Sequence, residues 1–380
     1  MSNVTNSKPN KRNGIVICGS YGQGNAGDES ILKAILQEIH QAAPEENVTV
    51  LSRNPEETAV RHGVHALHMF DIAGFKKIMR SAKLYINGGG SLIQDITSRR
   101  SLWYYLFTLR TAKKCGCKVL MYGCGIGPVT HSQDISLTRK ILNKYVDAIT
   151  LREDSSLKEL QKFGVNKPEI ILASDPALTL QRASDAEIDA LMQRCGLDPN
   201  GAYLGLCLRN WTGFKSKAPI FADVIQYAKS AYGLTPVFIS INHLSDGATA
   251  DQVISLLDSS IPKESIYVSR QPLSTEETLG LMSRMQTVIS MRLHGLIFAA
   301  GQGIPLVGVV YDPKVKAFLK YINQPLYENL DEITSESLCK NLDHALALRN
   351  DRAALKNAVS HLRMVEQNNT ETLLKLLKTI

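Results

Sequence analysis

Short apolar runs alternate with longer helical stretches along the whole chain. In the first half, such runs lie at residues 14–18, 48–51, 83–86, 118–122, 148–151 and 169–172. They are apolar on both sides of the strand alternation, which is typical of parallel strands buried on both faces. The intervening segments, such as 30–41 and 102–114, have the spacing of helices. This order predicts an α/β fold in which βαβ units form a doubly wound parallel sheet.

A second series of runs begins after Asp175 and Pro176. A polar helical stretch ends in a turn signal near residue 200, and strand-like runs follow at 203–208, 236–241, 265–268, 287–290 and 305–310. We therefore expect two Rossmann-like domains that face a cleft, followed by a C-terminal helix, which resembles the GT-B arrangement of glycosyltransferases. The expected ranges are an N-terminal domain over 14–176, a linker region over 177–200, a C-terminal domain over 201–349 and the helix over 350–380.

Composition sets bounds on location and partners. The 380 residues suit two domains of ~150 residues each. The net charge of +7 is compatible with anionic substrates or with an anionic membrane surface. Residues 1–13 are polar and lack the apolar core of a signal peptide, so we expect a disordered tail there. Because no apolar run reaches the ~18 residues of a membrane span, we expect a cytoplasmic protein that touches the membrane at most peripherally.

One polar turn, Arg292 to Gly295, separates the apolar run at 287–290 from a helix-like run at 296–300. Such a turn lies at the carboxyl edge of a parallel sheet, where open α/β proteins bind ligands. The free N–H groups of a helix start favour an anion, and Arg292 adds a charged fork suited to phosphate or carboxylate. His294 can move a proton near neutral pH. The alternative is an arginine that caps a carbonyl group and a histidine that packs on the sheet.

The loop after the first strand has the pattern Gly-x-Gly-x-x-Gly, at Gly22, Gly24 and Gly27. Alone, this pattern indicates a nicotinamide cofactor. Asp28 and Glu29 argue against that cofactor, because they occupy the first turn of the next helix and would repel a pyrophosphate. The loop is therefore expected to bring backbone close to another ligand, with Asp28 or Glu29 near an acceptor hydroxyl. Simple capping of the helix by Asp28 is the alternative.

Further polar groups are expected at the same edge of the sheet. Two more glycine-rich turns follow the third and fourth strands, at 87–91 and 123–128, and they indicate close approach of the backbone to a ligand. Arg152 ends another strand and is a second candidate for binding an anion. In the second half, Lys314 and Lys316 oppose the dipole in the first turn of a helix, which a bound anion would explain. Otherwise both lysines are solvated.

Taken together, these motifs resemble those of the polysaccharide pyruvyl transferase family. The matching segments lie in order over about residues 14 to 320, at 21–32, 87–95, 125–128, 151–153, 290–294 and 311–314. They are most similar to the bacterial cell-wall branch, whose members ketalate a secondary cell-wall polymer that anchors surface-layer proteins. The family's Arg-Leu-His motif falls on Arg292, Leu293 and His294.

The resemblance implies a transferase that needs no cofactor and no metal and that uses phosphoenolpyruvate as its donor. His294 would protonate the methylene carbon of the donor, a sugar hydroxyl would attack C2, phosphate would leave and a 4,6-ketal would close. The implied base for the sugar hydroxyl is Asp28, Glu29 or Glu153. The residues implied to take part in the reaction are Asp28, Glu29, Arg292 and His294. Those implied to bind substrate are Gly22, Asn25, Gly27, Asn87, Gly88, Gly89, Gly90, Gly125, Gly127, Arg152, Leu293, Lys314 and Lys316.

The acceptor implied by the resemblance is an N-acetylmannosamine residue on a lipid-linked oligosaccharide at the inner face of the cell membrane. No nucleic acid is expected as a partner, and the oligomeric state stays open. Three other functions compete: a GT-B glycosyltransferase that uses a nucleotide sugar, a non-catalytic sugar-binding protein, and an NAD(P)-linked oxidoreductase. The glycosyltransferase would need a pocket for base and ribose in the second half, and the sequence shows no carboxylate placed for it.

Overall fold

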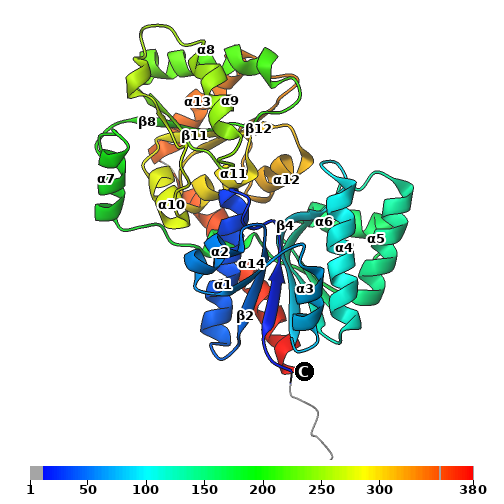
Figure 1. Cartoon of the computed structure of the whole chain (residues 1–380). Helices are drawn as coiled ribbons and strands as arrows, with labels where there is room; N and C mark the ends of the chain where they lie inside the picture. Colours follow the sequence, from blue (N-terminus) through cyan, green and yellow to red (C-terminus); the bar gives the residue numbers. More distant parts are fainter. Residues whose placement is uncertain (1–11, 351, 380) are drawn as a thin grey trace, which may run out of the picture.

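The computed structural model describes residues 12–350 and 352–379 and contains two parallel sheets, each covered by helices on both faces. Figure 1 shows the two resulting lobes, the first built from the blue and cyan half of the chain and the second mainly from the green to orange half. Apolar clusters fill both faces of each sheet. The predicted fold class, two Rossmann-like units in a GT-B-like arrangement, is confirmed. None of the helices in the described residues combines the length and hydropathy needed to cross a bilayer.

The sheet of the first lobe has seven strands in the order β3-β2-β1-β4-β5-β6-β7. Its strands are β1 (Ile15–Cys18), β2 (Val48–Ser52), β3 (His65–His68), β4 (Leu84–Ile93), β5 (Lys118–Ile126), β6 (Ala148–Leu151) and β7 (Glu169–Leu172). The helices that connect them are α1 (Ala26–Ala42), α2 (Pro55–His62), α3 (Ile72–Met79), α4 (Arg99–Lys114), α5 (Ser132–Tyr145) and α6 (Asp154–Phe163).

The sheet of the second lobe has six strands in the order β10-β9-β8-β11-β12-β13. Its strands are β8 (Tyr203–Cys207), β9 (Thr235–Phe238), β10 (Tyr267–Val268), β11 (Thr287–Ser290), β12 (Leu306–Val310) and β13 (Tyr327–Asn329). The helices of this lobe are α7 (Asp185–Arg194), α8 (Phe214–Tyr232), α9 (Asp246–Ile254), α10 (Thr275–Ser283), α11 (Leu293–Gly301), α12 (Pro313–Tyr321) and α13 (Ser335–Ala347). Short 3-10 turns lie at Pro176–Thr179, Lys263–Ser265 and Leu348–Asn350.

The last helix, α14 (Ala353–Lys378), returns from the second lobe to the first. Val359 and Leu362 near its start belong to the core of the second lobe, whereas Leu373 packs in the core of the first. Its polar contacts follow the same path, since Thr370 donates to Glu38 of α1 at 2.9 Å. This helix, coloured red in Figure 1, therefore connects the two lobes through contacts with both cores.

The structure corrects several local predictions. The glycine-rich segments at 87–91 and 123–128 are not turns, because most of their residues lie inside β4 and β5 and are hydrogen-bonded to neighbouring strands. Strands β3 and β13 were not expected. Of the tail predicted over 1–13, residues 1–11 lie outside the described residues, while Arg12 donates to the Ala82 carbonyl at 2.6 Å. The polar helical stretch expected within the linker region 177–200 is α7, and this helix packs into the core of the second lobe.

Candidate active site

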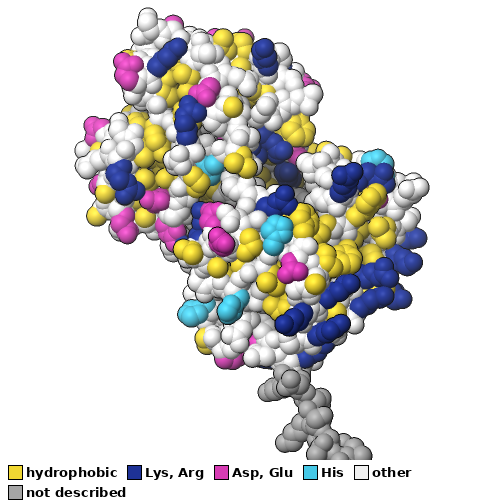
Figure 2. Space-filling model, viewed as in Figure 1, with side chains coloured by type: hydrophobic (Ala, Val, Ile, Leu, Met, Phe, Trp, Pro, Cys, Tyr) yellow, Lys and Arg dark blue, Asp and Glu magenta, His cyan; other side chains and the backbone are white. Residues whose placement is uncertain are grey.

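A cavity of ≈ 220 Å³ lies between the carboxyl edges of the two sheets. It sits where the strand order of each sheet reverses, between β1 and β4 and between β8 and β11, the place where open α/β proteins bind ligands. Figure 2 shows dark blue Lys and Arg side chains gathered in this hollow between the lobes. Among the described residues, Asp28 is the single acidic side chain that lines it, against four basic ones: Arg152, Arg209, Arg292 and Lys314. The cavity therefore suits a small anion.

His294 lies in the first turn of α11 and is buried. Its imidazole reaches across to the first lobe and rests on Gly27 of α1, since a Cβ atom built on Gly27 would lie 2.1 Å from Nδ1. Its Nε2 lies 3.7 Å from Asp175 Oδ2 and has no hydrogen-bond partner among the described residues. Burial, helped by nearby cations, lowers the pKa of His294 to about 4, although Asp175 acts in the opposite direction. The imidazole of the free protein is therefore neutral at pH 7.

Arg292 is held by a carboxylate from a neighbouring helix. Its Nε lies 3.0 Å from Asp246 Oδ2, and its Nη2 contacts Asp246 Oδ1 and donates to Ser245 Oγ at 3.2 Å. Asp246 is buried and also accepts the backbone N–H of Ile241 at 3.1 Å. This network orients the guanidinium while Arg292 and Leu293 still line the cavity. The sequence prediction did not include Asp246, which lies 46 residues away from Arg292.

Arg152 is fixed in a similar way from the first lobe. Its Nε lies 2.8 Å from Glu153 Oε2, its Nη1 3.2 Å from Asp175 Oδ2 and its Nη2 2.9 Å from Ser91 Oγ. Glu153 accepts a second hydrogen bond from Ser156 Oγ at 2.6 Å and does not line the cavity. Glu153, one of the three candidate bases, is therefore engaged elsewhere. Asp175, which the sequence prediction passed over as a domain break, is the group that lies beside both Arg152 and His294.

The two lysines of α12 differ in their positions. Lys314 lines the cavity, and its Nζ lies 3.1 Å from the carboxylate of Asp312, the residue that caps the helix. Lys316 does not line the cavity, and its Nζ lies 5.5 Å from the centre of the Tyr327 ring. Residues two positions apart on a helix face different directions. The prediction that Lys316 contacts substrate is therefore not supported, whereas Lys314 is well placed.

A basic and aromatic group that was not predicted completes the wall of the cavity. Arg209, two residues beyond β8, donates to the Tyr311 hydroxyl at 2.7 Å. Its guanidinium lies 5.0 Å from the ring centre of Trp211 and 5.1 Å from that of Tyr311. Among the described residues no carboxylate lies within ion-pair distance of Arg209, unlike the other three cations of the cavity. Arg209 is thus the basic group of the cavity whose charge is least neutralised.

Comparison with known proteins identifies the family to which this chain belongs. The sequence model of polysaccharide pyruvyl transferases matches residues 25–313, which include every residue lining the cavity except Ser20 and Lys314. The chain belongs to the polysaccharide pyruvyl transferase family. A relative of this pyruvyl transferase is the amylovoran biosynthesis protein AmsJ of Erwinia amylovora, which is 21% identical over 82% of this chain and 86% of AmsJ. The protein is therefore an enzyme of pyruvyl transfer.

Solved structures share the fold of this pyruvyl transferase at low identity. The Anabaena protein HepE in complex with UDP-glucose is 12% identical, with a TM-score of 0.64, over 94% of this chain and 99% of its own. A putative UDP-N-acetylglucosamine 2-epimerase from Listeria monocytogenes is 12% identical, with a TM-score of 0.66, over 97% of this chain and 96% of its own. At this identity the likeness concerns the fold alone.

Asp28 and Glu29 point in different directions in this pyruvyl transferase. Asp28 lines the cavity and accepts from Asn25 Nδ2 at 2.6 Å, and Asn25, rather than Asp28, caps α1. Glu29 faces a second hollow, where it accepts from Gly22 N at 2.7 Å and lies 3.4 Å from His62 Nε2. Burial and the neighbouring Glu29 raise the pKa of Asp28 to about 7. Asp28, and not Glu29, is therefore placed to exchange a proton with a ligand in the cavity.

The glycine segments pack the framework of the pyruvyl transferase more than they line the cavity. Gly90 does line it, with φ 69°. A Cβ atom on Gly125 would lie 2.8 Å from Arg152 Nη2, so this glycine leaves room for the arginine. Asn87 is buried, and its side-chain amide has no hydrogen-bond partner among the described residues. Besides Lys316, the predicted ligand-binding residues that do not line the cavity are Gly22, Gly27, Asn87, Gly88, Gly89, Gly125 and Gly127.

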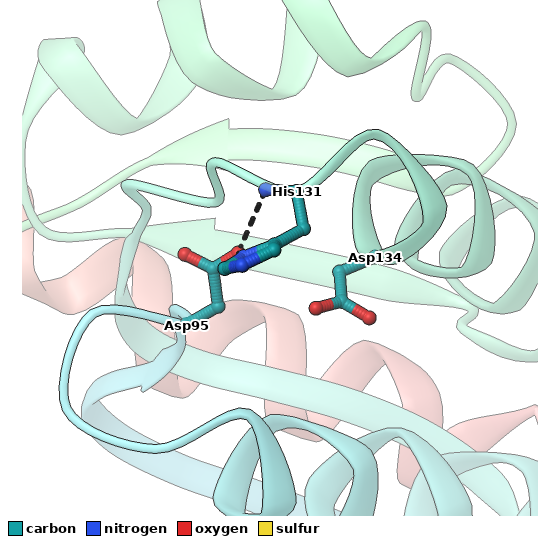
Figure 3. A group of neighbouring side chains, drawn as sticks. All are labelled: Asp95, His131 and Asp134. Carbon is teal, nitrogen blue, oxygen red and sulfur yellow. Dashed lines mark hydrogen bonds and ion pairs between the residues drawn. The ribbon is translucent and has the colours of Figure 1, made fainter.

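One side-chain cluster near the cavity, Asp95, His131 and Asp134, has ligand types that also occur in metal sites (Figure 3). Asp95 accepts from His131 Nδ1 at 2.8 Å, from the backbone N–H of His131 at 3.0 Å and from Thr130 N–H. Asp134 is paired with Arg99 at 2.7 Å and accepts from the Trp103 indole at 2.9 Å. The carboxylates thus already have strong donors, and the cluster holds together the loops after β4 and β5.

Proposed function

We propose that this enzyme transfers the pyruvyl group of phosphoenolpyruvate to two hydroxyls of one sugar in a polysaccharide or its precursor, with release of phosphate. The observation that carries the proposal is a compact cavity lined by four cations, one acid and a buried imidazole. Phosphoenolpyruvate bears a phosphate and a carboxylate on a small carbon frame. Hydrogen bonds from the guanidinium groups of Arg152 and Arg292 suit both the phosphate and the carboxylate. Arg209 and Lys314 supply further cationic donors in the same cavity.

A nucleotide sugar, the donor of the rival glycosyltransferase, suits this cavity less well. Pockets for drug-sized ligands measure about 300–1,000 Å³, whereas this cavity has ≈ 220 Å³. An antiparallel backbone bridge between Asn25 and Asn242 closes one side of it, with His243 N–H donating to Gly24 at 3.0 Å. Beyond the bridge lies the separate hollow that holds Glu29. A small donor is therefore favoured.

His294 is the proposed general acid. Its proton would go to the methylene carbon of the donor, which leaves C2 cationic and open to attack by a sugar oxygen. The lowered pKa of His294 comes from burial and from cations that a bound donor would neutralise. A trianionic donor therefore raises the pKa of the imidazole, and the acid becomes charged only when its substrate is in place. Its partner Asp175 would stabilise the imidazolium.

Asp28 is the proposed base for the attacking hydroxyl. A pKa of about 7 lets its carboxylate accept a proton near neutral pH, where general bases work best. The first sugar oxygen would bond to C2 as its proton passes to Asp28. The C2–O bond to phosphate would then break, with the proton on Asp28 passing to the leaving phosphate. A second hydroxyl of the same sugar would close the 4,6-ketal on C2 as its proton passes to His294, which restores the acid. We propose N-acetylmannosamine of a lipid-linked cell-wall precursor, the acceptor of the surface-layer branch, as the first acceptor to test.

The test is incubation of the purified protein with phosphoenolpyruvate and a synthetic lipid-diphosphate disaccharide that ends in N-acetylmannosamine, followed by mass spectrometry. The expected product is heavier by one pyruvyl ketal, with one phosphate released for each ketal formed. His294→Asn should stop turnover, while Lys316→Gln, outside the cavity, should not change it. Turnover by His294→Asn at the normal rate would remove His294 from the mechanism. Transfer from a nucleotide sugar, with phosphoenolpyruvate inert, would refute the proposed donor.

A further inference from the structure

The positive charge of the protein is concentrated in one segment. Residues 72–114, which include α3 and α4, hold nine Lys and Arg residues and one acidic residue, Asp95. The resulting net charge of +8 exceeds the +7 of the whole chain, so the rest of the sequence is close to neutral. Asp95 is buried under its hydrogen bonds to Thr130 and His131 and does not offset the cations at the surface. The catalytic cavity uses none of these nine basic residues.

The outward face of α4 combines these cations with exposed aromatic rings. Arg100, Trp103, Phe107, Arg110 and Lys114 are all exposed, and they recur every three or four residues, so they form one stripe along the helix. Trp103 is 44% and Phe107 37% exposed. The Trp103 indole N–H donates to Asp134 at 2.9 Å, which orients the ring while leaving it partly open to solvent. In Figure 2 this face lies at the lower right, where dark blue and yellow side chains alternate.

A shallow hollow of ≈ 400 Å³ lies between α3 and α4 and continues the stripe. Phe107 lines it together with four cations, Lys76, Arg80, Arg110 and Lys114. Among the described residues, none of these four has a carboxylate within ion-pair distance. At the start of α3, Phe70 is 51% and Ile72, the first residue of the helix, 36% exposed. We call the surface formed by α3, α4 and this hollow the α3–α4 face.

We propose that the α3–α4 face binds an anionic lipid bilayer. Aromatic and aliphatic side chains on such a face enter the boundary between headgroups and acyl chains, while unpaired cations contact lipid phosphates. The first turns of the same helix point into the catalytic site, since Ser101 and Tyr105 line the cavity. A bilayer bound along this face would therefore follow α4 from its C-terminal end, where the hollow lies, towards the N-terminal end that lines the cavity. This placement suits the lipid-linked acceptor of the proposed function, but the binding itself does not depend on that function.

The test uses the full chain and large unilamellar vesicles, without phosphoenolpyruvate or acceptor. We expect co-sedimentation with vesicles of phosphatidylcholine and phosphatidylglycerol, little with phosphatidylcholine alone, and release by salt. Each cation near an anionic surface strengthens binding about fivefold, so Arg110→Gln with Lys114→Gln should weaken partitioning roughly 25-fold. Lys215→Gln with Lys263→Gln is the matched control, because it removes the same charge from exposed positions of the second lobe and should bind normally.

A second readout follows the aromatic ring directly. The chain has two tryptophans, Trp103 and Trp211. In a Trp211→Phe background, brominated lipids in anionic vesicles should quench the remaining emission of Trp103. Loss of binding after Phe107→Ser, with an unchanged melting temperature, would support insertion of the ring.

Several outcomes would overturn the proposal. The first is equal binding of the protein to neutral and anionic vesicles. The second is an equal loss of vesicle binding in Arg110→Gln with Lys114→Gln and in the control double variant. The third is the absence of quenching of Trp103 by brominated lipids. Tight binding of a single-stranded oligonucleotide by a protein that leaves anionic vesicles in the supernatant would assign the face to nucleic acid instead. Turnover of a water-soluble acceptor should be unchanged in Arg110→Gln with Lys114→Gln. Failure of membrane binding and failure of pyruvyl transfer are therefore separate results.

Discussion

Replacement of Gly27 by alanine tests the contact that positions the imidazole of His294, the proposed general acid. The new Cβ atom would lie 2.1 Å from His294 Nδ1, and the ring must recede by about 1.3 Å to reach an ordinary contact of 3.4 Å. A displacement of about 1 Å in a catalytic group can lower the rate ~100-fold. The fold should tolerate the change for two reasons. Alanine is favoured over glycine in a helix by up to ~1 kcal/mol, and the group that must move to make room is the His294 side chain rather than backbone. We therefore expect kcat to fall about 100-fold while the fold survives.

The assay is steady-state phosphate release with saturating phosphoenolpyruvate and acceptor, together with a thermal melt of each protein. Gly301→Ala is the matched control, because Gly301 ends the same helix as His294 and its Cβ atom would meet nothing closer than 3.9 Å. This control should keep the wild-type kcat. Wild-type turnover by Gly27→Ala would show that the imidazole need not rest on α1, and loss of the melting transition would show that the contact is structural rather than catalytic.

Three further predictions follow from the same geometry. Arg209→Gln should raise the KM for phosphoenolpyruvate ~10- to 100-fold, because a hydrogen bond to a charged group contributes about 1.5–3 kcal/mol; an unchanged KM in initial-rate measurements would exclude Arg209 from donor binding. If His294 is the acid and Asp28 the base, kcat/KM is level between pH values of about 4 and 7 and falls on both sides, and Asp28→Asn should lose ~10²- to 10⁴-fold in rate and replace this plateau by a fall that begins above about pH 4. Burial raises the pKa of Glu366 to about 8, so its contribution to stability is lost as the pH rises through 8. Glu366→Gln should therefore melt higher than the wild type at pH 9 and similarly at pH 4, and an equal difference at both pH values would contradict this.

Much of the fold could be predicted from the sequence, because buried parallel strands leave a strong pattern. The same pattern placed Arg292 and His294 together at a sheet edge, since strand and helix run on both sides of the turn. The glycine segments were misjudged as turns. Glycine is a poor strand former, yet β4 has a parallel partner on each side, and those backbone hydrogen bonds outweigh local propensity.

The rest of the site depends on contacts between distant parts of the chain. Arg209 and Tyr311 are 102 residues apart, and the one local signal was an arginine directly beyond a strand with a tryptophan two positions on. Asp175 was hidden because an Asp-Pro pair is also a common turn. The different positions of Asp28 and Glu29 could have been predicted, because adjacent helical residues point about 100° apart.

The contact between His294 and Gly27 joins the two lobes at the candidate active site. His294 belongs to the second lobe, and Asp28, the proposed base, follows Gly27 in the first. Any movement that parts the lobes to admit a polymer would therefore also separate the proposed acid from the proposed base. If His294 and Asp28 act as proposed, catalytic competence belongs to the arrangement in which the two lobes touch. On the proposed mechanism a donor would then meet the acid only after the lobes close around it, which would keep water from the cationic C2 until the acceptor is enclosed.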